Sequence, residues 1–374
     1  MFPHLALTGS AHDRGRQYGE QASGQIRQSV EAYREVFAHY AHWDWPTVTS
    51  QALRYVDPIR GFDERYLTEI EGIAEGAGVP FPDVMAINVR TEVMFAAKAR
   101  DAAVTLPPVL ECSAFIAVPP DDGPVLIGQN WDWLTHAFDT TVILEVDPDD
   151  GPRYVTAVEA GLLAKTGFNE HGIGVCTNAL VCEDDVGAPG IPYHVMLRAL
   201  LDAEHPTQAL ATLQRAERSS SASYLVAHRD GLGLGVEAMP GNFSRLLLTE
   251  PDEAGLILHT NHFVHPAFDR VDVGAWVMPD SLFRMQRLRR ALRATDPHDA
   301  ATYEKLFTDH AGHPLGICCH PIESDPVPEQ GATVLSMVMD LDALTMRFAD
   351  GLPCQTGYRT IEYSSFLAGA RAAS

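Results

Sequence analysis

The chain has 374 residues, of which 46% are hydrophobic and 21% are charged, as is typical of globular proteins. Its formal net charge of -23 makes nucleic acid and anionic membrane surfaces poor partners, because like charges repel. The sequence shows no apolar run that would span a bilayer and no secretory signal, and its six sparse cysteines are typical of a reduced, cytoplasmic protein.

The first hundred residues are predicted to be mostly helical. Apolar side chains recur there at the spacing of one helix face, at Ile26, Val30, Tyr33, Phe37 and Tyr40. The stretch 101–108, DAAVTLPP, has the composition of a loop.

From Cys112 onward the pattern changes to short β-rich runs separated by Gly, Pro and Asp. The runs are SAFIAV, PVLIGQNW, TTVILEV, RYVTAVE, GIGVCTNAL, SYLVAH, LGLGVEAM, SRLLLTE, GLILHTN, TVLSMVMDL and LTMRFAD. Helices are predicted over 193–215 and from Ser281, with Arg284 on a solvated or salt-bridged face. Consecutive strands with short turns favour antiparallel sheets, so the sequence predicts an α+β layered sandwich.

Cys112 stands at the head of one of these strands, in LECSAF. A thiol becomes a strong nucleophile when a neighbouring group takes its proton. No papain-like signature surrounds this cysteine. If the bond between Glu111 and Cys112 is cut, however, the new α-amino group has a reference pKa of about 8 and can act as the base.

Polar residues near the ends of other strands are candidate companions of Cys112. Asn130 and Asp132 follow it by a strand, a turn and a strand, so a hairpin would return them to its side. Asn178 lies near the end of GIGVCTNAL and Asn261 ends GLILHTN, and an uncharged amide donor suits a developing oxyanion. Asparagines at strand ends also make ordinary turns, so each one alone is a weak signal.

Several motifs follow one another in a characteristic order. They are RTE at 90–92, ECSAF at 111–115, GQNWDW at 128–133, KTGFNEHGIGVCTNAL at 165–180 and HTNHFVHP at 259–266. In these motifs the chain resembles the acyl-coenzyme A:6-aminopenicillanate acyltransferase family, peptidase family C45 of the N-terminal nucleophile hydrolases. The resemblance implies a four-layer αββα sandwich of two antiparallel sheets, made as a precursor that cleaves itself before Cys112.

Residues 1–111 would then be a mostly helical small chain and 112–374 the nucleophile-bearing chain, associated as one globular domain. The resemblance implies that Cys112 attacks an amide or thioester of a small molecule to form an acyl-enzyme, with Asp132 and Asn261 as catalytic partners. Water or an amine resolves the acyl-enzyme, so hydrolysis and acyl transfer both stay open, as does homo-oligomerisation. Weaker, supporting assignments are Asn130, Asn178, Glu111 and His262.

Two positions depart from the family pattern. Glu111 precedes the nucleophile where fungal members have glycine, and Cys319, in GICCHP, replaces a family arginine. Cysteine cannot supply a permanent positive charge. Arg284 or Arg270 is expected to replace that charge. The alternatives are a different substrate, a catalytically reduced relative that binds acylated small molecules, or an interaction protein with an inert, buried Cys112.

No metal and no other cofactor is predicted. The histidines of HTNHFVHP suggest a metal site, but the sequence has neither the HEXXH spacing of a helical zinc site nor a cysteine pair with zinc-finger spacing. If the strand continued through this motif, His259 and His265 would share one face and His262 would point away. These histidines are therefore assigned to packing or to a pocket.

Overall fold

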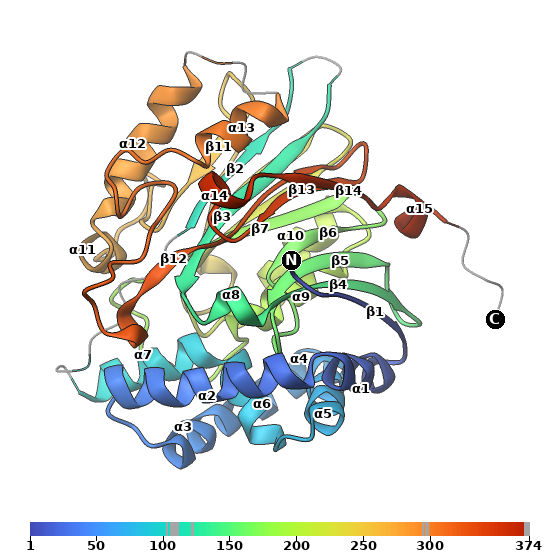
Figure 1. Ribbon diagram of the computed structural model, residues 1–374, viewed down its shortest axis with the longest axis vertical. Coiled ribbons are helices and arrows are strands. Elements are labelled where there is room, and N and C mark those ends of the chain that lie inside the picture. The colour runs from blue at the N-terminus through green and yellow to red at the C-terminus, as the bar shows by residue number, and fades with distance from the viewer. Residues whose placement is uncertain (102–103, 105–111, 121–122, 294, 296–298, 370–374) are drawn as a thin grey trace.

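The computed structural model describes residues 1–101, 104, 112–120, 123–293, 295 and 299–369. Two sheets pack face to face through β2, β3 and β7, and helices cover their outer faces (Figure 1). α9 and α10 contact β7 and β8 of one sheet, while α12 and α13 contact β11 and β12 of the other. The predicted αββα sandwich is confirmed.

The larger sheet has eight strands in the order β1-β4-β5-β6-β7-β8-β9-β10. Its strands are β1 (His4–Gly9), β4 (Thr141–Pro148), β5 (Tyr154–Glu159), β6 (Thr166–Asn169), β7 (Ile173–Ala179), β8 (Ala222–His228), β9 (Leu232–Ala238) and β10 (Leu246–Thr249). The smaller sheet has six strands in the order β11-β2-β3-β12-β13-β14. They are β2 (Cys112–Ala117), β3 (Leu126–Leu134), β11 (Leu256–His259), β12 (Gly331–Asp340), β13 (Thr345–Asp350) and β14 (Arg359–Glu362).

Seven helices of the described chain lie between β1 and β2 in sequence and gather at one end of the molecule, in blue in Figure 1. They are α1 (Ala11–Gln21), α2 (Ser23–Tyr40), α3 (Trp45–Ala52), α4 (Val56–Phe62), α5 (Glu64–Ala77), α6 (Phe81–Asn88) and α7 (Arg90–Arg100). The later helices are α8 (Ala137–Thr140), α9 (Tyr193–Leu201), α10 (Pro206–Arg215), α11 (Gly274–Val277), α12 (Asp280–Leu292), α13 (Ala300–Leu306), α14 (Pro353–Thr356) and α15 (Ser364–Leu367). Short 3₁₀ turns lie at Leu53–Tyr55, Phe243–Arg245 and Val327–Glu329.

The expectation that both sheets are antiparallel is wrong at one edge. β1 was not predicted, and it pairs with β4 in parallel. A parallel neighbour needs a long crossover, and here the whole helical segment from α1 to α7 lies between the two strands in sequence. The helices predicted over 193–215 are α9 and α10, and Pro206 starts the second after the end of α9 at Leu201.

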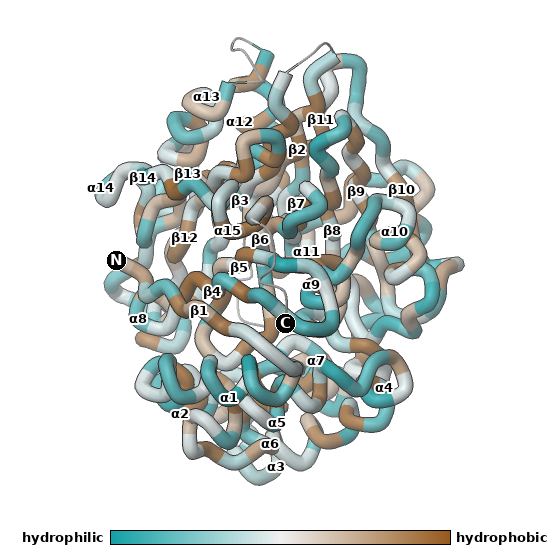
Figure 2. The backbone as a smooth tube through the Cα atoms, turned by 90° about the vertical axis from the view of Figure 1, so that its right-hand side faces the viewer, coloured by the Kyte–Doolittle hydropathy of each residue, from teal (hydrophilic) through white to brown (hydrophobic). Residues whose placement is uncertain are grey.

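The strands that carry the nucleophile are buried on both faces. Every residue of β2 and β3 is buried, because these strands lie between β7 of the other sheet and the outer helices. Hydrophobic stretches follow strands such as β12 in Figure 2, whereas hydrophilic stretches are prominent in the N-terminal helices. Within the described part of the chain, no helix combines the length and apolar character needed to cross a membrane.

Candidate active site

The hairpin of β2 and β3 returns the NWD motif to Cys112, as predicted. Cys112 pairs with Trp131, so Asp132 is the next residue along the neighbouring strand. The backbone N–H of Asp132 lies close enough to lower the pKa of the Cys112 thiol. Cys112 itself is 3% exposed, which places its sulfur inside the sandwich.

The backbone of Cys112 is held by three side chains from distant segments. Its N–H donates to Oδ1 of Asn261 at 2.6 Å. Its carbonyl oxygen accepts from Nη1 of Arg284 at 2.8 Å and from Nδ2 of Asn178 at 3.0 Å. The predicted companions Asn178 and Asn261 therefore both meet the nucleophile, but each contacts its backbone.

Arg284 is the arginine that the structure brings to Cys112. The sequence predicted a solvated or salt-bridged helix face for it and also proposed it as a replacement for the family arginine. The salt bridge is present, to Asp280, but the side chain is 1% exposed and points from α12 into the site. Besides Cys112, its guanidinium donates to Ser113 Oγ at 3.1 Å, to Asn261 Oδ1 at 3.1 Å and to Asp280 Oδ2 at 2.7 Å. The other candidate, Arg270, is 37% exposed in its side chain and pairs with surface aspartates.

The hydrogen bonds around Asn261 fix the orientation of its amide. Oδ1 meets two donors, on Cys112 and Arg284, and Nδ2 donates to Ala179 O at 3.0 Å. The amide oxygen therefore faces the nitrogen of Cys112. The proposal that the amide nitrogen stabilises an oxyanion remains a prediction.

His262 is connected to Asn261 through the hydroxyl of Ser281. Ser281 Oγ accepts the backbone N–H of Asn261 at 2.7 Å and lies 2.8 Å from Nδ1 of His262. Burial lowers the pKa of His262 to about 4, so the ring is neutral at neutral pH. The strand β11 ends at His259, so the expected face shared by His259 and His265 does not form, and Nε2 of His259 pairs with Glu237 at 2.9 Å.

Asp132 is fully buried behind Cys112. Burial raises the pKa of its carboxyl group to about 7, while Arg284 and a hydrogen bond from the Thr333 hydroxyl act in the opposite direction. Thr333 Oγ1 also accepts the backbone N–H of Cys319 at 2.9 Å. Cys319, the position of the family arginine, thus touches the site through its backbone.

Asn130 forms hydrogen bonds to the outer layer. Its Nδ2 donates to the carbonyls of Phe307 and Ile317 at 3.0 and 2.7 Å. It therefore anchors the loop after α13 to β3. Glu111, the other side of the proposed cleavage point, lies outside the described residues.

Lys165 is the residue that sequence reasoning missed. It is 4% exposed, and its ammonium lies over the rings of Trp131 and Tyr193, at 4.7 and 5.8 Å from their centroids. Burial raises the pKa of the Cys112 thiol to about 11, and the nearby Lys165 charge is the strongest effect that lowers it. Burial likewise lowers the pKa of Lys165 to about 8. Its motif KTGFNEHG was noted in the sequence, but nothing local showed that a buried cation would sit beside a thiol.

The sequence pattern of the acyl-coenzyme A:6-aminopenicillanic acid acyl-transferase family matches residues 118–354. The chain belongs to this family. The match includes Asp132, Asn178, Asn261 and Arg284 and begins after Cys112.

A curated member of this family is the acyl-coenzyme A:6-aminopenicillanic-acid-acyltransferase 40 kDa form of Emericella nidulans. It is 26% identical over 342 residues, which cover 90% of this chain and 89% of the relative. Among solved structures, a mutant of conjugated bile acid hydrolase from Clostridium perfringens is 15% identical, with a TM-score of 0.46 over 68% of this chain and 93% of that one. Penicillin V acylase from Agrobacterium tumefaciens is 13% identical, with a TM-score of 0.41 over 68% of this chain and 86% of that one.

Proposed function

We propose that the chain is a self-processing amidohydrolase or acyltransferase that works through an acyl-enzyme at Cys112. The observation that carries this proposal is the hydrogen bond made by the backbone nitrogen of Cys112. Asn261 accepts a hydrogen bond from that nitrogen at 2.6 Å, and Arg284 donates to the same asparagine oxygen at 3.1 Å. Every buried backbone N–H needs an acceptor, and here that acceptor is a side chain held by a buried arginine at the one nitrogen that self-cleavage would turn into an amine.

Self-cleavage would turn this nitrogen into an α-amine. In the first step the Cys112 sulfur bonds to the carbonyl carbon of Glu111, the peptide C–N bond breaks, and the nitrogen takes up the thiol proton. Water then hydrolyses the resulting thioester and releases the Glu111 carboxylate. The products are the chains 1–111 and 112–374, with Cys112 at the new N-terminus.

The new amine is well placed to act as the base. Arg284 donates to the Cys112 carbonyl and to Asn261 Oδ1, so its positive charge would stand beside the new amine and disfavour the protonated form of that amine. Asn261 Oδ1 fixes the direction of one N–H, because an amide oxygen only accepts hydrogen bonds. The lone pair of the neutral amine is then available to take the proton of its own thiol, as general base catalysis requires.

In turnover, the sulfur attacks the carbonyl carbon of the substrate and the amine takes the thiol proton. The amine then passes this proton to the departing nitrogen as the tetrahedral intermediate collapses to a thioester on Cys112. Water or an acceptor amine attacks that thioester and frees the enzyme. The charge of the buried Lys165 and the nearby backbone N–H of Asp132 both favour the thiolate form of Cys112.

A cavity with a mainly apolar wall is proposed to hold the acyl group of the substrate. The cavity has a volume of ≈ 550 Å³ and a mainly apolar wall. Its apolar lining includes Tyr40, Phe95, Val181, Val186, Val273 and Val277. Its wall also carries Lys98, Glu183, Asp185 and Glu329, and its link to the site along the chain is Val181, two residues after Ala179, whose carbonyl accepts from Asn261.

The small chain would remain bound after cleavage. Glu92 of α7 is fully buried and accepts from the Tyr193 N–H and the Ser220 hydroxyl, each at 2.7 Å. Arg90 pairs with the buried Glu159 at 3.4 Å. These contacts join the segment before Cys112 to the segment after it. We place the protein in the cytoplasm, where a thiol nucleophile stays reduced.

The test is to trap the acyl-enzyme. Purified protein is incubated with N-acyl amino acids, β-alanyl amines and β-lactam side-chain amides and quenched with acid. Mass spectrometry should find the acyl mass on a fragment that begins at Cys112, and Cys112→Ala should carry none. Adding an acceptor amine distinguishes transfer from hydrolysis by the product formed. Binding of the amides without acylation of Cys112 would instead favour the catalytically reduced relative.

A further inference from the structure

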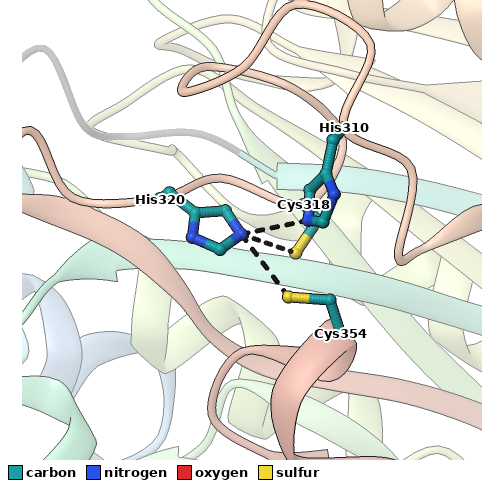
Figure 3. A group of neighbouring side chains, drawn as sticks. All are labelled: His310, Cys318, His320 and Cys354. Carbon is teal, nitrogen blue, oxygen red and sulfur yellow. Dashed lines mark hydrogen bonds between the residues drawn. The ribbon is translucent and has the colours of Figure 1, made fainter.

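Two histidines and two cysteines converge on one point at the outer face of the smaller sheet (Figure 3). His310, Cys318 and His320 lie in the loop between α13 and β12, and Cys354 lies in α14. Their ligand atoms all lie within 4.8 Å of one another. Nε2 of His320 is 3.1 Å from Nε2 of His310, 3.6 Å from the Cys318 sulfur and 3.5 Å from the Cys354 sulfur.

Hydrogen bonds among these four side chains cannot satisfy this arrangement. One imidazole nitrogen carries either one N–H or one in-plane lone pair, so it makes one good hydrogen bond. Three partners nevertheless surround Nε2 of His320, as the dashed lines in Figure 3 show. A cation at the centre would instead accept a lone pair from all four groups at once.

The three separations measured from Nε2 of His320 are close to those of a tetrahedral zinc ion. With Zn–S of about 2.3 Å and Zn–N of about 2.05 Å, a regular tetrahedron separates nitrogen from sulfur by about 3.5 Å and nitrogen from nitrogen by about 3.3 Å. The observed N–S separations are 3.5 and 3.6 Å and the N–N separation is 3.1 Å. Two thiolates would also balance the charge of Zn²⁺.

We propose that His310, Cys318, His320 and Cys354 bind one zinc ion. Both thiols lose their protons to solvent on binding, and both histidines bind through Nε2 in the neutral form. Four protein ligands leave no open coordination position, so the site is structural. It is separate from the chemistry at Cys112, and its existence does not rest on the proposed function.

The zinc ion would fasten the loop that supports the active-site aspartate. Cys319, next to the ligand Cys318, donates its N–H to Thr333, whose hydroxyl donates to Asp132. Two residues before Cys319, the carbonyl of Ile317 accepts from Asn130 on the same strand as Asp132. The ion would therefore tie this loop to α14 on one side while the loop holds β3 on the other.

The first experiment measures zinc bound to the full-length protein after expression in zinc-supplemented medium and gel filtration. Elemental analysis should find about one zinc per wild-type chain. Cys318→Ser and Cys354→Ala should each fall to background. The matched control is His313→Ala: His313 lies in the same loop, with its ring 5.1 Å from that of His320, but outside the four-ligand set. It should keep its zinc.

Cobalt substitution gives a second readout that does not depend on activity. Cobalt bound by two thiolates and two imidazoles in a tetrahedron shows intense visible d–d bands and thiolate-to-cobalt charge transfer, and both should vanish in Cys354→Ala. A chelator should also lower the melting temperature of the wild type and leave that of Cys354→Ala unchanged.

Two outcomes would overturn the proposal. One is a wild type that carries no zinc and gives no tetrahedral cobalt spectrum, including the case where peptide mapping finds Cys318 bridged to Cys354 as a disulfide. The other is zinc content that survives in Cys318→Ser and Cys354→Ala, or that is lost only in His313→Ala.

Discussion

Arg284→Lys keeps the positive charge beside Cys112 and removes the planar fork. The guanidinium reaches Cys112 O at 2.8 Å through Nη1 and Asn261 Oδ1 at 3.1 Å through Nη2. A lysine has one ammonium group and cannot reproduce two donors held in a plane. The variant should therefore lose at least one of these bonds, and a hydrogen bond to a charged group contributes about 1.5–3 kcal/mol.

That loss corresponds to about a 10- to 150-fold slower reaction at Cys112, since each 1.36 kcal/mol is tenfold. The rate of Cys112 alkylation by iodoacetamide measures this without a known substrate, and kcat/KM follows once one is found. Arg290→Lys is the matched control, because Arg290 is exposed on the same helix. Melting curves must show that both variants are folded. If Cys112 in Arg284→Lys is alkylated at a rate within twofold of the wild-type rate, the role assigned to Arg284 is refuted.

Three further outcomes are expected. Asn261→Ala should lower kcat by about 10²- to 10³-fold if the amide acts on the reacting centre, and a normal kcat would remove it from that role. Lys165→Met should move the pH profile of Cys112 alkylation to higher pH, because the Lys165 charge lowers the pKa of that thiol, whereas the exposed Lys305→Met should leave it in place. Asp132→Asn should gain stability relative to the wild type as pH rises. Burial raises the pKa of Asp132 from 3.8 to about 7, so its favourable contribution is complete below about pH 4 and is lost as pH rises through about 7. Urea unfolding at pH 5 and pH 8 checks this, and an unchanged difference between the two proteins would contradict it.

The elements that sequence reasoning placed correctly have strong local patterns. The regularly spaced apolar residues from Ile26 to Tyr40 lie on α2, where they are buried on its inner face. The two apolar runs before and after DDGP form β2 and β3. These strands pair so that Cys112 lies opposite Trp131. β1, β6 and β14 were missed because strands of four to six residues carry little periodicity of their own.

The errors at the site arise from tertiary burial. A helix rich in arginine looks solvated in sequence, and only packing against β11 shows that Arg284 points inward. The proposed zinc ligands were likewise invisible to spacing rules, because Cys354 lies 34 residues beyond His320. Lys165 has no local signature, since its effect depends on the thiol of Cys112 from the facing sheet.

The central claim is that Cys112 becomes an N-terminal nucleophile by self-cleavage. Intact-mass spectrometry and N-terminal sequencing of purified wild type and Cys112→Ala test it most directly. The wild type should give two co-purifying chains, one of which begins at Cys112, and Cys112→Ala should remain a single chain. A wild type that stays intact, with a Cys112 that resists iodoacetamide, would contradict the claim.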